Sequence, residues 1–150
     1  MDVRTDAKVL VTVERRIERP PNMVWKVLSD IEAWPEWNPA VERAQLSGAL
    51  LPGAEFRWRA SGVRIHSVLR DVMRPSRLSW TGKTMGLRAV HVWEIEAVDG
   101  GGASLVRSRE SLDGWWLSPF RRRIQHSVER STAAWLDALA RRSGQEVHCG

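Results

Sequence analysis

The sequence has one cysteine, no tyrosine and no long hydrophobic run. Cys149 alone forms neither an internal disulfide nor a structural zinc site. A transmembrane helix needs roughly 20 consecutive apolar residues, and no segment approaches that length. Residues 1–6 are polar, and no apolar signal-peptide core follows them. We therefore expect a cytoplasmic protein without a metal, a cofactor or integral membrane contact.

Motifs for several common chemistries are also missing. The sequence contains no G-x-S-x-G nucleophile elbow, no phosphate-binding glycine loop and no H-E-x-x-H zinc motif. Cys149 lies beside His148 in the C-terminal tail, where a catalytic thiol is not expected. The other histidines lie on different expected elements, without a second ligand at metal spacing; they are His66, His91 and His126.

Arginine and tryptophan, by contrast, are abundant. The net charge is +5, 20 of the 23 basic residues are arginine, and nine tryptophans are present. An arginine excess is compatible with nucleic acid or an anionic membrane as a partner. We favour a solvated surface, because the arginines alternate outward along the expected strands and the aromatic rings lie on the other face. We interpret the run Arg121–Arg123 in the same way. No nucleic-acid partner is expected, and the reason for the excess stays open.

Apolar residues recur mainly with the period of a β-strand. The 150 residues contain no repeat or linker, so we expect one domain, with flexible ends at residues 1–6 and 143–150. Strands separated by glycine and proline turns are predicted at Lys8–Glu18, Val41–Ser47, Ala54–Ala60, Val63–Met73, Leu78–Gly82, Leu87–Val98 and Ala103–Leu112. Strands joined in this way form an antiparallel meander.

Helical spacing replaces the strand pattern after the first strand and again near the end. Pro20–Asn22 opens one short helix, and Ile31–Trp37 forms another. A long helix follows Gly114, with Ser118 as its cap and Pro119 at its first position. Its apolar stripe comprises Leu117, Phe120, Ile124, Val128, Trp135 and Leu139. Such a stripe must lie on an apolar surface, and the sheet is the only candidate.

Two segments carry a family resemblance. Pro20 to Asp30 reads P-x-x-x-V-W-x-x-L-S-D, and Trp34 to Pro39 reads W-P-x-W-N-P. With the order of elements, they resemble the polyketide cyclase/dehydrase branch of the SRPBCC superfamily, which includes START lipid-transfer domains and birch-pollen-allergen-like proteins. The resemblance extends from about Lys8 to Arg142. It implies an α+β helix-grip fold, in which a curved antiparallel sheet of about seven strands wraps around the long C-terminal helix and encloses a ligand cavity. It does not fix the chemistry.

The hairpin around Gly100 can be placed in register from the sequence. If Asp99 pairs with Gly102, His91 lies opposite Glu110 on a face that is otherwise apolar. Two ionisable groups in such a place shift each other's protonation, and they are candidates for a general base and the group that orients it. His91 and Glu110 are therefore the candidate catalytic residues. A structural hydrogen-bonded pair, or a pair that binds a polar ligand atom, is the alternative.

The same alternation identifies the side chains that face the expected cavity. Large rings that cannot fill a curved sheet completely leave a pocket between them. The expected ligand-binding residues are Phe56, Trp58, Trp80, Trp93, Ile95, Ser108, Leu112, Ile124, Val128 and Trp135. Across Pro75-Ser76, Met73 is expected to pair with Leu78 and Asp71 with Trp80, which leaves the role of Asp71 open. Trp115 and Trp116 stand where a pocket mouth is expected.

Three functions are compatible with these features. The first is a carrier or binding protein for a small hydrophobic molecule, such as a polyketide, a lipid or an aromatic compound. The second is a polyketide cyclase/aromatase or dehydratase, in which His91 and Glu110 steer proton transfers on a chain held folded by the cavity. The third is a protein-interaction module with an occluded cavity. The sequence identifies neither the ligand nor the oligomeric state, which is a monomer or a dimer.

Overall fold

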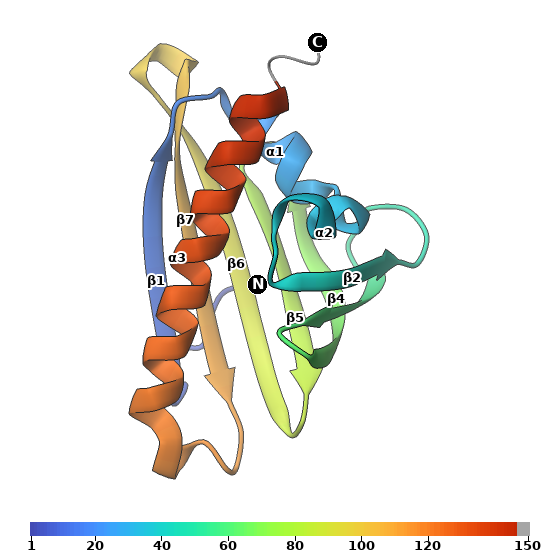
Figure 1. Cartoon of the computed structure of the whole chain (residues 1–150), viewed down its shortest axis with the longest axis vertical. Coiled ribbons are helices and arrows are strands. Elements are labelled where there is room, and N and C mark those ends of the chain that lie inside the picture. Colours follow the sequence, from blue (N-terminus) through green and yellow to red (C-terminus); the bar gives the residue numbers. More distant parts are fainter. Residues whose placement is uncertain (147–150) are drawn as a thin grey trace.

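Seven antiparallel strands form one curved sheet in the order β1-β7-β6-β5-β4-β3-β2, and a long helix, α3, lies along one face of it (Figure 1). This computed structural model describes residues 1–146. The strands are β1 (Val9–Ile17), β2 (Val41–Leu46), β3 (Glu55–Ala60), β4 (Val63–Met73), β5 (Arg77–Thr84), β6 (Leu87–Val98) and β7 (Ala103–Asp113). The predicted helix-grip architecture is confirmed.

Helices and short 3₁₀ turns accompany the sheet. The α-helices are α1 (Pro21–Ser29), α2 (Trp34–Trp37) and α3 (Arg121–Glu146), and the short 3₁₀ turns are η1 (Ile31–Ala33), η2 (Asp99–Gly101) and η3 (Ser118–Phe120). Pro21 begins α1 because the first helical turn needs no backbone N–H there. Phe120 was predicted on the buried stripe, but it is 50% exposed. It belongs to η3, which precedes α3, and so it does not follow the phase of the long helix.

The register of β6 and β7 agrees with the prediction. Ile95 lies opposite Val106, and His91 lies opposite Glu110. Across β4 and β5 the prediction was wrong, because Leu78 pairs with Val72. An irregularity between Leu69 and Val72 shifts the pairing of the two strands by one residue. The alternation of β4 side chains between the two faces of the sheet is therefore interrupted at this point.

Asp71 lies within this irregularity, on the outer face of the sheet. Its carboxylate accepts hydrogen bonds from Ser79 Oγ at 2.7 Å, the Met1 amino group at 3.0 Å and Arg77 Nε at 3.1 Å. Burial opposes the ionisation of Asp71, but the hydrogen bonds outweigh it and lower the pKa to about 2. Asp71 therefore joins the N-terminal segment to β4 and β5, and it takes no part in the cavity.

The inner face of the sheet is filled at one end by a cluster of large rings. Trp34 is fully buried, and its ring centroid lies 5.2 to 5.6 Å from those of four other rings, Phe56, Trp58, Trp80 and Trp135. A second cluster, nearer the start of α3, contains Val9, Val11, Leu112 and Leu117. The interior is therefore densely packed around the aromatic cluster and contains fewer buried side chains near the start of α3.

Residues near both ends of the described part of the chain are buried or hydrogen-bonded. Val3 is buried in a small cluster with Val90 and Val92, and the Arg4 N–H donates to Ser111 Oγ at 3.1 Å. Ser143 is buried near the end of α3. The expected flexibility of residues 1–6 and 143–150 stays a prediction, and His148 and Cys149 lie outside the described residues.

Candidate functional site

A cavity of about 160 Å³ lies on the inner face of the sheet, between the two hydrophobic clusters. Its lining residues all come from β3 to β7; they are Trp58, Ile65, Ser67, Trp80, Gly82, Thr84, Leu87, Ala89, His91, Glu110 and Leu112. The wall is mainly apolar, with His91 and Glu110 as its ionisable groups.

Small side chains on three neighbouring strands create this space. Ser67, Gly82 and Ala89 are paired across β4, β5 and β6, so they lie at the same level of the sheet. A Cβ atom at Gly82 would lie 3.3 Å from Ser67 Oγ and 3.9 Å from Ala89 Cβ. The three residues of this row therefore lie close together, and because their side chains are small, the space on the inner side of the sheet next to them stays empty.

His91 and Glu110 form a hydrogen-bonded pair in the wall of the cavity. His91 Nδ1 lies 2.8 Å from Glu110 Oε2, and the two residues face each other across β6 and β7. The His91 side chain is 3% exposed and that of Glu110 is 19% exposed. Because a carboxylate only accepts hydrogen bonds, Nδ1 of His91 carries the proton in this contact.

The other ring nitrogen of His91 is also engaged. Nε2 lies 2.7 Å from Ser108 Oγ, so in neutral His91 it accepts a hydrogen bond from the Ser108 hydroxyl. Ser108, His91 and Glu110 thus have the connectivity of a serine–histidine–carboxylate triad. However, Ser108 is fully buried and does not line the cavity. It orients the imidazole and does not reach a ligand there.

Three indole rings fix the plane of the His91 imidazole. The ring centroids of Trp80, Trp93 and Trp135 lie 4.9, 5.1 and 5.7 Å from that of His91. Tight aromatic contacts and two hydrogen bonds leave the ring a single orientation. The imidazole is consequently a preorganised support for Glu110.

Glu110 is the polar group best placed to meet a ligand. Ser67 Oγ accepts from Trp58 Nε1 at 3.0 Å, and Thr84 Oγ1 donates to the Arg64 carbonyl at 2.7 Å, so both hydroxyls already have partners. Within residues 1–146, Glu110 makes no side-chain hydrogen bond or ion pair other than the one with His91. One carboxylate oxygen is therefore available to a hydrogen-bond donor in the cavity.

The predicted site residues fall into two groups. Trp58, Trp80 and Leu112 line the cavity together with the predicted pair. The others lie outside its lining: Phe56, Trp93, Ile95 and Trp135 in the aromatic cluster, Ser108 behind His91, and Ile124 and Val128 partly buried on α3. Their roles stay predictions. Sequence reasoning missed Gly82 as a wall residue, although the period-two pattern placed it on a strand.

A wider cleft of about 480 Å³ is lined by residues of β2 to β5, and it shares Trp58 and Ile65 with the inner cavity. It is surrounded by cationic side chains, including Arg43, Arg57, Arg59, Arg64 and Lys83. It is larger than the inner cavity, but it is more open to solvent and most of its lining side chains are charged, so it encloses an apolar molecule less completely. The inner cavity is therefore the candidate ligand site.

The described part of the chain has no helix that is long and apolar enough to cross a membrane. Nor do three or more histidine, cysteine, aspartate or glutamate side chains within residues 1–146 form a group that could hold a metal ion.

Comparisons with known proteins agree with this architecture. Residues 8–144 match the family described as polyketide cyclase/dehydrase and lipid transport. A search of curated protein sequences finds no significant match.

Three solved structures illustrate the likeness of fold. A hypothetical protein from Helicobacter pylori superposes with a TM-score of 0.81 at 19% identity, covering 93% of this chain and 90% of the other. The Zhui aromatase/cyclase from Streptomyces gives 0.79 at 16%, with 97% and 96% covered. A START superfamily protein from Mycobacterium smegmatis gives 0.77 at 14%, with 91% and 97% covered. At these identities the likeness concerns the fold alone.

Proposed function

The chain belongs to the polyketide cyclase/dehydrase and lipid transport family of the SRPBCC superfamily, and from this premise we propose that it binds a small, mainly apolar molecule carrying a hydrogen-bond donor. The ligand occupies the cavity on the inner face of the sheet, and the protein acts as a carrier or binding protein. One observation carries the proposal: Glu110, held by His91, faces a mainly apolar hollow with one carboxylate oxygen free.

The size of the cavity limits the ligand. Pockets for drug-sized ligands span about 300–1,000 Å³, whereas an apolar cavity of roughly 150 Å³ accommodates benzene. At about 160 Å³ this cavity suits a single aromatic ring with small substituents. A polyketide chain or a lipid enters only if the sheet and α3 separate, so a compact phenol-like molecule is favoured.

The polar wall adds selectivity to this fit. A hydrogen bond to a buried carboxylate contributes about 1.5–3 kcal/mol. A ligand without a donor leaves that oxygen of Glu110 desolvated and unpaired, which costs binding energy. We therefore expect a ligand hydroxyl to be preferred over a methyl group of the same shape by about tenfold or more.

A pair of small aromatic compounds tests the proposal. Para-cresol and para-xylene have the same shape, but only the cresol has a hydroxyl. Titration calorimetry should give tighter binding of cresol, and Glu110→Gln should reduce the difference because the acceptor loses its charge. Glu96→Gln, an exposed change on the neighbouring strand β6, should leave it unaltered. No binding of either compound, or equal binding of both, would rule the proposal out.

The alternative is a cyclase/aromatase or dehydratase. It is favoured by the same pair, because Glu110 supported by His91 can take a proton from an enolisable carbon and return it to an oxygen. An enzyme should lose turnover of a poly-β-ketone substrate in His91→Ala with a modest loss of affinity. A carrier should change in affinity only, so the two functions separate in one assay.

A further inference from the structure

Three large apolar side chains are exposed at the end of the molecule where β5 turns into β6 and where α3 begins. Trp115 is 82% exposed, Met85 is 70% exposed and Phe120 is 50% exposed. They come from the β5–β6 turn, the segment after β7, and η3. A single exposed apolar residue is ordinary, but a group at one end of a molecule marks an interaction site. We call these three residues the apolar tip.

The tip is held together by contacts between its segments. Trp116 Nε1 donates a hydrogen bond to the Met85 carbonyl at 2.8 Å. A Cβ atom at Gly86, whose φ is +76°, would lie 3.2 Å from Trp115 Nε1, so the indole rests against the turn. Phe120 N–H donates to the Leu117 carbonyl at 2.9 Å, which closes the η3 turn. The exposed rings are therefore positioned by the fold.

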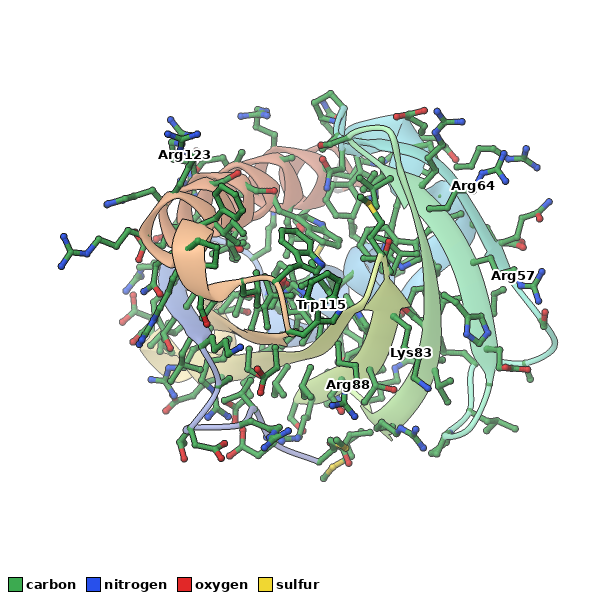
Figure 2. All side chains as sticks on the ribbon, turned by 90° about the horizontal axis from the view of Figure 1, so that it is seen from below. Arg57, Arg64, Lys83, Arg88, Trp115 and Arg123 are labelled. Atoms are coloured by element: carbon green, nitrogen blue, oxygen red, sulfur yellow. The ribbon has the colours of Figure 1, made fainter. Side chains whose placement is uncertain are left out.

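Exposed cations surround the tip on two sides. They are Lys83 and Arg88 on the β5–β6 hairpin and Arg121, Arg122 and Arg123 in the first turn of α3. Figure 2 looks onto this end, with Trp115 near the centre, Lys83 and Arg88 on one side of it and Arg123 on the other. We call these five residues the cationic rim.

The rim carries uncompensated charge. Within residues 1–146, no member of the rim forms an ion pair, whereas Arg59, Arg77 and Arg109 on the outer face of the sheet all pair with carboxylates. Asp113 lies opposite Arg88 in register, but its carboxylate contacts Arg4 at 3.8 Å. The rim charges are thus available to an anionic partner.

We propose that the apolar tip and the cationic rim dock this protein peripherally on an anionic phospholipid membrane. Tryptophan and other large apolar side chains insert at the boundary between headgroups and acyl chains, and surrounding arginines and lysines are attracted to anionic headgroups. A second copy of the chain is a poor partner, because two rims would face each other with the same charge. A single-stranded nucleic acid needs a groove with aromatic platforms, whereas these rings project from turns.

The proposal goes beyond ligand binding, and it connects to the cavity. Thr84 and Leu87 flank the Met85–Gly86 turn and line the cavity. Docking through the tip therefore places that end of the cavity next to the acyl chains. An apolar ligand could then exchange with the membrane without crossing bulk water.

Vesicle co-sedimentation of the full chain tests the docking. The probe is phosphatidylcholine vesicles containing about one-third phosphatidylserine, with pure phosphatidylcholine vesicles for comparison. We expect binding to the anionic vesicles only, weakened by high salt because the attraction is screened.

Each arginine near an anionic surface strengthens binding about fivefold, so the triple change Arg121→Gln, Arg122→Gln, Arg123→Gln should weaken it about a hundredfold. Trp115→Ala should weaken it at least about tenfold.

A matched control removes the same charge elsewhere. Arg74→Gln, Arg130→Gln and Arg141→Gln together change exposed arginines that belong neither to the rim nor to the cleft that Lys83 lines. If this variant loses as much binding as the tip variant, net charge and not the tip is responsible, and the proposal fails. It also fails if wild type ignores the vesicles, if it prefers a single-stranded oligonucleotide, or if Trp115→Ala abolishes self-association instead. Cresol binding by the same variants reports on the cavity separately.

Discussion

The imidazole of His91 stacks on the indole of Trp93, with ring centroids 5.1 Å apart and an interplanar angle of 24°. The two residues are two positions apart on β6, so both side chains project from the inner face. The stack, the Ser108 contact and the Glu110 contact together determine where the ring lies. Stability and ligand binding should therefore respond separately to changes in this part of the structure.

Breaking the pair should cost more than removing it. His91→Leu leaves the Glu110 carboxylate without its partner in a mainly apolar wall, and we expect it to lower the free energy of unfolding by about 2 kcal/mol. The double change His91→Leu, Glu110→Leu should recover part of this loss, because no charge is then left unpaired. Urea denaturation measures both. An additive double mutant would argue against coupling of the two side chains.

Filling the cavity should prevent ligand binding while leaving the pair in place. Ala89→Phe introduces a ring into the row of small side chains that includes Ser67 and Gly82. We expect the affinity for cresol to fall below detection in calorimetry, since the ring occupies the ligand volume. Ala97→Phe, at an exposed position on the same strand, is the matched control. Cresol binding that survives in Ala89→Phe would place the ligand elsewhere.

Two tryptophans should differ sharply in their effect on stability. Trp34 is fully buried, packs against four aromatic rings and donates to the Leu28 carbonyl at 2.9 Å. Trp34→Ala should cost about 3–5 kcal/mol, because it opens a large void in the core. Trp115→Ala should change the unfolding free energy by less than about 0.5 kcal/mol, since its side chain is mostly in solvent. Thermal or urea unfolding compares the two directly.

Asp71 should make the stability depend on acid. Its pKa is lowered from 3.8 to about 2 in the folded chain. A lowered carboxyl pKa stabilises the fold fully above the unfolded pKa, and the contribution disappears as the pH falls toward 2. Asp71→Asn should therefore lower the unfolding free energy by about 2 kcal/mol at pH 7. The gap from wild type should close between about pH 4 and pH 2.

The control for that titration is Asp6→Asn. Asp6 is 75% exposed and pairs weakly with Arg4 at 3.4 Å, so its removal should have little effect at any pH. A gap for Asp71→Asn that stays constant down to pH 2 would mean that its ionisation does not stabilise the fold.

The sequence predicted most of the fold because strand and helix periods are local properties. The β6–β7 register followed from one short turn, and it placed His91 opposite Glu110 without any structural information. The β4–β5 register failed because the shift between Leu69 and Val72 leaves no trace in the alternation of residues. A bulge is chosen by the packing of the whole sheet.

The cavity was harder to predict than the sheet. Alternation identifies the face of a residue, and so it gave the tryptophans a common role. In the structure Trp93 and Trp135 fill space, and the hollow arises where Gly82 meets Ser67 and Ala89. That row depends on the registers of three hairpins at once. The exposure of Phe120 similarly depends on where α3 begins, which helical spacing alone does not specify.

The lining of the cavity comes entirely from strands, and this separates recognition from support. Residues such as Trp135 and Leu139 on α3 secure the helix to the sheet without bordering the hollow. Substitutions at Ser67, Gly82 or Ala89 can therefore resize the binding site while the seam between helix and sheet stays intact. One or two methyl groups added or removed on these neighbouring strands would reset the size of molecule that the cavity admits.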